Sequence, residues 1–161
     1  MRAQIHNAEQ GRGGQENDQY RHADAGSGAV RLLDPDGTER LAVEPFPGFA
    51  GGVRVAVADF DRDGVEDLVV GTGPGRSTRV VVIDGATRRE LFSIDPFEAA
   101  FHGGVYVAAG DLTGDRIADL VVTPDEGGGP RVQVYSGSGF GKVADFFGID
   151  DPNFRGGARA A

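Results

Sequence analysis

Residues 55–70 read VAVADFDRDGVEDLVV and residues 107–122 read VAAGDLTGDRIADLVV, with eight of the sixteen positions identical at an offset of 52. The likeness extends in both directions, because Gly-Gly-Val precedes each copy at 51–53 and 103–105. Farther along, RVVV at 79–82 matches RVQV at the same offset. A fixed period of this length is typical of stacked supersecondary units. The sequence therefore predicts a repeat protein built from copies of one unit.

Each copy is expected to form four short strands. In the first copy, β-branched runs near 53–58, 67–70, 79–83 and 90–94 are separated by turn residues. Asp84-Gly85 is typical of a hairpin between the third and fourth strands, and Ser136-Gly137 has the same place in the second copy. No convincing helical periodicity is present in the body of the chain. The pattern predicts an all-β fold of four-stranded antiparallel β-propeller blades, too few to close a ring.

The repeat divides the chain into five expected segments. Residues 1–27 carry Ile5 as their only large aliphatic residue and are rich in polar residues, so we expect a disordered tail. Residues 28–50 match the two outer strands of a partial blade. Residues 51–102 and 103–153 are the two full blades, and residues 154–161 are expected to be the first strand of a truncated next blade.

Composition narrows the classes of partner. The 161-residue chain has a net charge of −9, which argues against nucleic acid as a partner. No apolar run is long enough to span a membrane, so no membrane insertion is expected. No signal peptide is recognisable, because no apolar stretch follows Arg2. The chain contains no cysteine, which excludes a disulfide framework.

Closely spaced carboxylates between two apolar runs require an explanation. Counting Asp59 as position 1, aspartates occupy positions 1, 3, 5 and 9, with Gly64 at position 6 for a sharp turn. Ca²⁺ takes six to eight oxygen ligands, which a tight loop with alternating acidic side chains supplies. The alternative is a polar hairpin whose acids face water. The spacing favours a strand–loop–strand calcium site, because a cation would cancel the repulsion among the carboxylates.

The second copy of the loop is weaker as a cation site. Asp111, Asp115 and Asp119 keep positions 1, 5 and 9. Thr113 replaces the aspartate at position 3, and Arg116 replaces the glycine at position 6. The loop thus has one carboxylate fewer and a cation nearby, so we expect a lower affinity for Ca²⁺ than in the first loop.

These features together resemble the FG-GAP (VCBS-type) repeat, the blade family of integrin α-subunit propellers and many bacterial surface proteins. The resemblance is carried by Phe49, Gly51-Gly52, the loop at 59–67 and the segment VVGTGP at 69–74. By this resemblance the Ca²⁺ ligands of the first loop would be Asp59, Asp61, Asp63, the Val65 carbonyl and Asp67. Those of the second loop would be Asp111, Thr113, Asp115, the Ile117 carbonyl and Asp119.

No catalytic constellation is visible, so the chain is not expected to be an enzyme. His102 is expected to be a solvated turn residue, and no serine lies in a nucleophile elbow. The resemblance implies a non-catalytic, calcium-binding segment of an extracellular or bacterial cell-surface protein, used for adhesion or for recognition of a protein or glycan. The alternative is an accessory propeller of a Ca²⁺-dependent polysaccharide-degrading enzyme. Self-association, or the remainder of a larger propeller, is expected to complete the fold.

Overall fold

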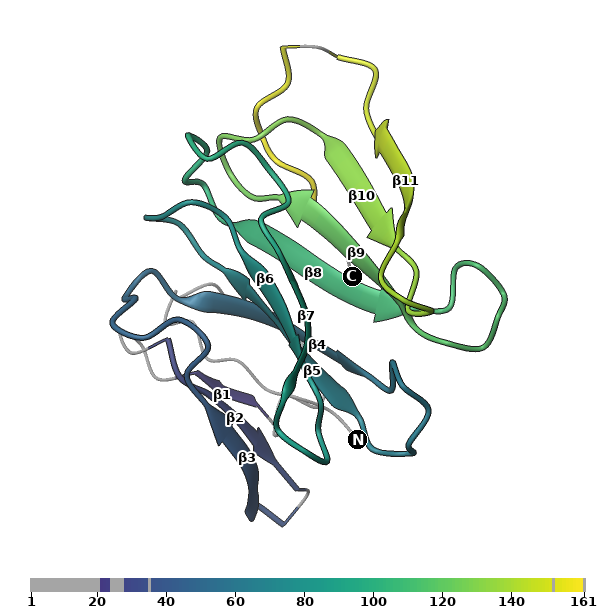
Figure 1. The fold of residues 1–161 in the computed structure, drawn as a ribbon. Coiled ribbons are helices and arrows are strands. Elements are labelled where there is room, and N and C mark those ends of the chain that lie inside the picture. The colour runs from purple at the N-terminus through teal and green to yellow at the C-terminus, as the bar shows by residue number, and fades with distance from the viewer. Residues whose placement is uncertain (1–20, 24–27, 35, 152, 161) are drawn as a thin grey trace.

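A computed structural model describes residues 21–23, 28–34, 36–151 and 153–160. Within these ranges the chain forms eleven strands and no helix. Every strand pairs antiparallel with a neighbour in sequence, and the strands make three sheets (Figure 1). The predicted all-β fold of four-stranded antiparallel sheets is confirmed.

The sheets follow one another along the chain. We name them the front sheet, blade 1 and blade 2. The front sheet contains β1 (Arg21–Ala23), β2 (Val30–Leu33) and β3 (Glu39–Val43). Blade 1 contains β4 (Val53–Ala58), β5 (Asp67–Thr72), β6 (Val80–Ile83) and β7 (Glu90–Ile94). Blade 2 contains β8 (Val105–Gly110), β9 (Asp119–Pro124), β10 (Arg131–Tyr135) and β11 (Lys142–Phe147).

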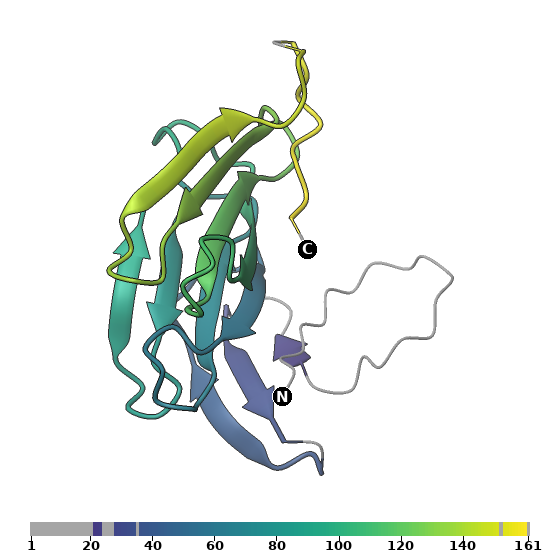
Figure 2. The same cartoon turned by 90° about the vertical axis from the view of Figure 1, so that its right-hand side faces the viewer.

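Two hydrophobic cores hold the three sheets side by side (Figures 1 and 2). The first joins the front sheet to blade 1 and includes Leu41, Phe46 and Leu68. The second joins blade 1 to blade 2 and includes Val82 and Leu120. Every residue of β5 and β6 is buried, because blade 1 is covered on both faces.

The hairpin predicted at Asp84-Gly85 is confirmed, but its loop is longer than a two-residue turn. The N–H of Asp84 donates to the carbonyl of Arg89, and the N–H of Arg88 donates back to the carbonyl of Asp84, both at 2.9 Å. Gly85 is required for close approach: a Cβ there would lie 2.1 Å from the Glu66 carbonyl oxygen. Gly137 stands in the same relation to the Ala118 carbonyl, at 2.0 Å, so the repeat preserves this packing.

Two expected segments differ from the structure. Residues 21–23, inside the expected disordered tail 1–27, form β1 and pair with β2, so the expectation is wrong there. Residues 1–20 and 24–27 lie outside the described residues. Residues 154–160 are not a strand, although the N–H of Ala158 donates to the Pro124 carbonyl at the end of β9. A blade's first strand pairs with the second strand of its own blade, and the described residues supply none.

The described part of the chain includes no helical segment with the length and apolar character needed to cross a membrane.

Candidate metal centre

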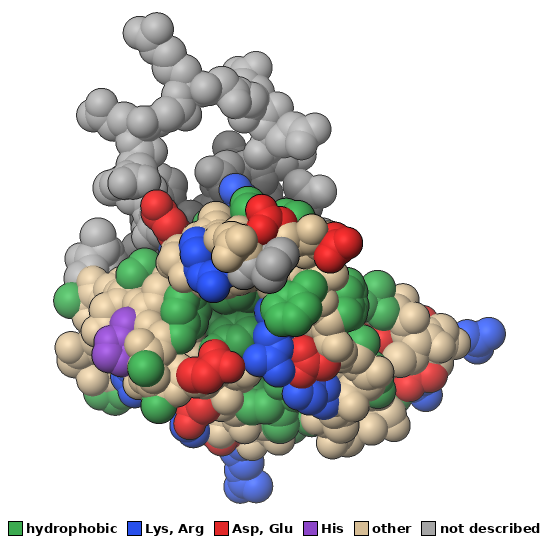
Figure 3. Space-filling view, turned by 90° about the horizontal axis from the view of Figure 1, so that it is seen from above, with side chains coloured by type: hydrophobic (Ala, Val, Ile, Leu, Met, Phe, Trp, Pro, Cys, Tyr) green, Lys and Arg blue, Asp and Glu red, His purple; other side chains and the backbone are tan. Residues whose placement is uncertain are grey.

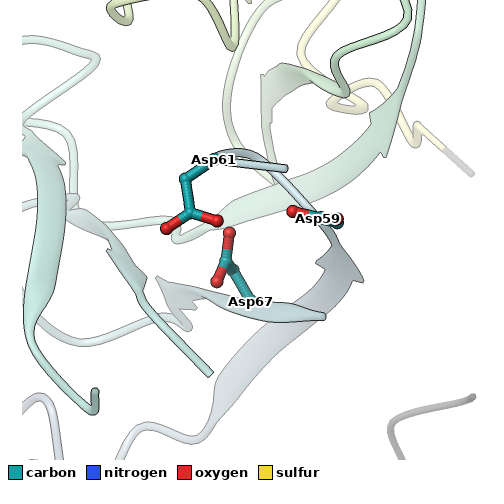
Figure 4. A group of neighbouring side chains, drawn as sticks. All are labelled: Asp59, Asp61 and Asp67. Carbon is teal, nitrogen blue, oxygen red and sulfur yellow. The ribbon is translucent and has the colours of Figure 1, made fainter. Parts of the chain in front are cut away.

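The candidate site is the loop that connects β4 to β5 in blade 1. Asp59 directly follows β4, and Asp67 is the first residue of β5, where it pairs with Ala58. The loop between them turns back so that Asp61 points toward Asp67 (Figure 4). One carboxylate oxygen from each of Asp59, Asp61 and Asp67 lies within 4.8 Å of the others. The strand ladder therefore brings together both ends of the loop.

A second acidic group overlaps the first. Oxygens of Asp61, Asp63 and Asp84 also lie within 4.8 Å of one another. Asp84 comes from the β6–β7 hairpin and is 6% exposed. Its carboxylate accepts hydrogen bonds from the Thr87 hydroxyl and from the N–H groups of Thr87 and Ala86. These hydrogen bonds lower the pKa of Asp84, and the one from the Thr87 hydroxyl has the largest effect.

The loop carboxylates also hold their own backbone. Asp59 accepts hydrogen bonds from the N–H groups of Arg62, at 2.6 Å, and Gly64, at 3.0 Å. Asp61 accepts from the N–H of Asp63, and Asp63 accepts from the N–H of Val65. Each carboxylate has about four lone-pair positions, so these contacts leave oxygen electrons for a cation.

Asp67 is fully buried and joins the loop to the hairpin. Its two oxygens accept hydrogen bonds from Phe60 N–H at 2.8 Å and Gly85 N–H at 3.0 Å. Burial raises the pKa of Asp67 to about 6 despite these donors, and the negative charges of Asp61 and Asp84 add to the rise. The groups around Asp67 thus stabilise its negative charge only in part, and a bound cation would stabilise that charge further.

The second loop, between β8 and β9, keeps the same backbone conformation with different residues. Positions 4 and 6 are left-handed in both loops. In the first loop they are Arg62 at φ 65° and Gly64 at φ 84°, and in the second they are Gly114 at φ 79° and Arg116 at φ 68°. Glycine and arginine have exchanged places. The substitution of Arg116 for glycine therefore does not change the path of the loop.

In the second loop, hydrogen bonds from the protein itself stabilise the negative charge of the carboxylates. Asp119 accepts from the N–H groups of Leu112, Thr113 and Gly137, and from the Thr113 hydroxyl. Burial acts to raise the pKa of Asp119, but these donors outweigh it and hold the pKa below its usual value. Thr113 thus supplies a donor where the first loop has the carboxylate of Asp61.

The two loops also touch each other. The guanidinium of Arg62, in the first loop, donates a hydrogen bond to the backbone carbonyl of Asp115, in the second. The contact spans the gap between blade 1 and blade 2. The two loops are therefore neighbours in one edge of the molecule.

The structure brings together some of the sequence-predicted residues and not others. Asp59, Asp61 and Asp67 form one group, and Asp63 joins through Asp61 and Asp84. Among the residues described, Asp111, Asp115 and Asp119 form no such group of three. Val65 and Ile117 lie at position 7, where their N–H groups donate to Asp63 and Asp115. Their carbonyls as ligands remain a prediction.

Sequence reasoning missed Asp84 because Asp84-Gly85 was interpreted only as a turn. A signal was present, since the second copy has serine there and the first has a further carboxylate. Only the fold shows that the hairpin lies against the loop.

Stacked four-stranded antiparallel sheets, each with an acidic or polar loop between its first two strands, define a β-propeller type of repeat protein. Comparison with known proteins gives the family of the repeat in blade 1. The FG-GAP repeat family matches residues 51–83, which include β4, the acidic loop, β5 and β6. The chain is also 36% identical over 85 residues to integrin alpha-5 of Xenopus laevis. That match covers 52% of this chain and 8% of the integrin subunit, so the chain spans a small part of this relative. Residues 51–83, in blade 1, are thus an FG-GAP repeat.

Proposed function

We propose that the chain is a calcium-binding propeller segment of a secreted or cell-surface protein, with a non-catalytic role in adhesion or in recognition of a protein or glycan. The observation that carries the calcium part is the convergence of Asp59, Asp61 and Asp67 on one point of a tight loop. The FG-GAP match at residues 51–83 and the similarity to integrin alpha-5 support the surface location and the role in recognition.

The donor set fits a hard divalent cation. Every side chain of the first loop that is placed to bind the ion is a carboxylate, and hard cations such as Ca²⁺ prefer oxygen ligands. Asp59, Asp61, Asp63 and Asp67 would hold the ion, with the Val65 carbonyl. A bound Ca²⁺ would supply the positive charge that the buried Asp67 lacks, and would fix the loop against the hairpin.

The second loop is proposed as a weaker site. Asp111, Thr113, Asp115, Asp119 and the Ile117 carbonyl would be its ligands. Backbone donors and the Thr113 hydroxyl already satisfy Asp119, so a cation there would gain less. We place both sites in the extracellular affinity range, on the order of 10⁻⁴–10⁻³ M.

A thermal unfolding series tests the calcium proposal. At 10 mM Ca²⁺ a site with this affinity stabilises the folded chain by about 1.4–2.7 kcal/mol, which raises the unfolding midpoint by several degrees. The same scan in a chelator, and in a sodium salt at matched ionic strength, controls for general effects of salt. An unchanged midpoint in Ca²⁺ contradicts the proposal.

A reducing-end assay tests the non-catalytic role against the enzymatic alternative. Incubated with extracellular polysaccharides in Ca²⁺, the chain should release no new reducing ends. Release of reducing ends that depends on Ca²⁺ would overturn the non-catalytic role.

A further inference from the structure

The residues between the acidic positions of the first loop contact blade 2. Positions 1, 3 and 9 of this loop are Asp59, Asp61 and Asp67, whose carboxylates converge on one point. Positions 2 and 4 are Phe60 and Arg62, and both of their side chains contact residues of blade 2. Successive residues of the loop thus serve two neighbours, the candidate cation site and the next blade.

Phe60 anchors the first loop to blade 2 by apolar packing. It is 3% exposed, and its ring centroid lies 5.7 Å from that of Phe140, in the β10–β11 hairpin. The ring of Phe140 also stacks on that of Phe92 in β7, with centroids 4.5 Å apart and planes at 4°. Because this packing is apolar, it does not require a cation in the loop.

Arg62 connects the first loop to the second by polar contacts. Its N–H donates to the carboxylate of Asp59 at 2.6 Å, so its backbone is tied to a proposed ligand of the first loop. Its guanidinium donates to the backbone carbonyl of Asp115 in the second loop. The carboxylate of Asp115 is a proposed ligand there, and it accepts the N–H of Ile117 at 2.8 Å. One side chain therefore joins the proposed ligand sets of the two loops.

The backbone of Arg62 has a conformation that arginine rarely adopts. Its φ is 65°, and the second loop has Gly114 at the same position, at φ 79°. Glycine would avoid the strain, but it has no side chain with which to reach the neighbouring loop. Strain that persists in a folded protein often serves a function. For Arg62, that function is suggested by the contact with Asp115.

We propose that Arg62 is a positioning residue that couples the two loops, so that a cation in the first loop raises the cation affinity of the second. Coordination by Asp59 and Asp61 would fix the backbone of Arg62 on both sides. The guanidinium would then hold the Asp115 carbonyl at a smaller cost in conformational entropy, and the second loop would be ordered before its own cation binds. The inference rests on the proposed calcium binding and adds a regulatory link between the two sites.

Fixed charges also act on both loops, and they must be separated from this contact. A guanidinium near a loop disfavours a cation there by simple repulsion. The face of the molecule seen from above has both acidic and basic side chains (Figure 3), so the electrostatic field at a loop is a sum over several charges. The coupling is therefore measured as a ratio, the factor by which emptying one loop changes the Kd of the other. Fixed charges cancel in this ratio.

Arg88, in the β6–β7 hairpin, provides a matched control for Arg62. It is also exposed and left-handed, at φ 64°. Its guanidinium also donates to a backbone carbonyl of a neighbouring sheet, that of Arg40 in β3, at 3.4 Å. Arg88 thus has the same charge, the same backbone strain and the same kind of contact, but it reaches the front sheet and not the second loop.

A Ca²⁺ titration of the full chain, followed by NMR, tests the coupling. The amides of Gly64 and Gly114 report on the first and second loops separately. Asp63→Ala empties the first loop, and we expect the Kd of the second loop to rise about threefold, a small factor because the contact is exposed. Asp111→Ala empties the second loop, and by reciprocity the Kd of the first loop should rise by the same factor.

Variants of Arg62 show whether this residue transmits the coupling. In an Arg62→Ala background, Asp63→Ala should leave the Kd of the second loop unchanged. Arg62→Lys, which keeps the charge and a donor, should retain part of the factor, and Arg88→Ala should retain all of it. The unfolding midpoint of Arg62→Ala without Ca²⁺ should stay near that of the parent, because Phe60 still packs on blade 2. A factor that persists in Arg62→Ala, or is lost in Arg88→Ala, contradicts the proposal.

The remaining outcomes separate the coupling from the calcium proposal. If Gly64 and Gly114 both shift in Ca²⁺ but the two Kd values are independent, the coupling is overturned and calcium binding stands. The same holds if Gly64 shifts and Gly114 does not, or if emptying the first loop tightens the second. Absence of shifts at both glycines overturns calcium binding and the coupling together.

Discussion

At the scale of single residues, the two acidic loops show that backbone conformation and cation affinity are separate properties. Both loops have two left-handed residues, one glycine and one arginine. Glycine adopts this region without strain, whereas an L-residue incurs roughly 1–2 kcal/mol. Each loop therefore stores some strain at its arginine, Arg62 in one and Arg116 in the other.

Replacing Arg116 with glycine should relieve that strain. We expect Arg116→Gly to stabilise the chain by about 0.5–1 kcal/mol in urea unfolding, because relief of the strain exceeds the added freedom of glycine in the unfolded state. Arg89→Gly is the control: Arg89 is an exposed arginine that is not left-handed, so the substitution should destabilise slightly. Equal effects of the two substitutions would contradict the strain argument.

Single residues also show how much of the site could be predicted from the sequence. Spacing alone identified Asp59, Asp61 and Asp67, because a local loop of nine residues sets their convergence. It could not place Asp84, which reaches the loop only through the pairing of β5 with β6. It also could not show that Arg116 adopts the left-handed conformation that glycine has in the first loop, because the exchange with Gly114 is seen only in three dimensions.

At the scale of elements, the hairpin between β6 and β7 is fastened to the acidic loop by one close approach. Gly85 donates its N–H to Asp67, and its Cα lies against the Glu66 carbonyl. The sequence predicted the hairpin from Asp84-Gly85 but assigned the glycine to turn conformation. The glycine is needed because a side chain would collide with another loop.

A matched pair of alanine substitutions tests this role of glycine. Gly85→Ala should destabilise the chain by roughly 1–3 kcal/mol, the usual effect of overpacking, because its Cβ would lie 2.1 Å from a backbone oxygen. Gly110→Ala, at the end of β8, has no atom within 4 Å of the new Cβ and should be neutral or slightly stabilising. Chemical denaturation of both variants gives the comparison, and a neutral Gly85→Ala would contradict the packing.

Strand boundaries were predictable where alternation and turn residues were strong. The ranges 53–58 and 90–94 coincide with β4 and β7, whereas 67–70 extends to Thr72 in β5. β1 was missed because three residues carry no periodic signal of their own and depend on pairing with β2.

At the scale of the whole molecule, the repeat allows the exposed fractions of equivalent residues in blade 1 and blade 2 to be compared. Phe60 and Leu112 hold the same position in the two loops, yet Phe60 is 3% exposed and Leu112 is 63% exposed. Phe60 packs against Phe140 of blade 2, with ring centroids 5.7 Å apart. The same difference recurs in β11, where Phe146 is 51% exposed while its counterpart Ile94 packs into the core between the blades.

Truncating these two equivalent residues should give very different results. Phe60→Ala should lose roughly 3–5 kcal/mol of unfolding free energy, because it leaves a cavity between the blades. Leu112→Ala should stay within about 0.5 kcal/mol of the parent chain, as expected for an exposed position. Thermal or urea unfolding measures both, and a large loss in Leu112→Ala would mean that the outer face of blade 2 is covered in solution.

The uncovered outer face of blade 2 should also cause self-association in solution. Phe146, which pairs with Val132 in the edge strand β11, lies on this face and is 51% exposed. We expect concentration-dependent self-association by light scattering, reduced in Phe146→Asp and unchanged in Ala42→Asp on the outer face of the front sheet. A compact monomer at all concentrations would contradict this expectation.

The most direct test of the account is a calcium titration by calorimetry on three chains: the parent, Asp63→Ala and Asp115→Ala. These two aspartates share position 5 of their loops, so the variants differ only in which loop is impaired. The account predicts that Asp63→Ala removes the tighter binding event and that Asp115→Ala removes only the weaker one. Loss of the tighter event in Asp115→Ala, or no calcium heat in the parent chain, would contradict it.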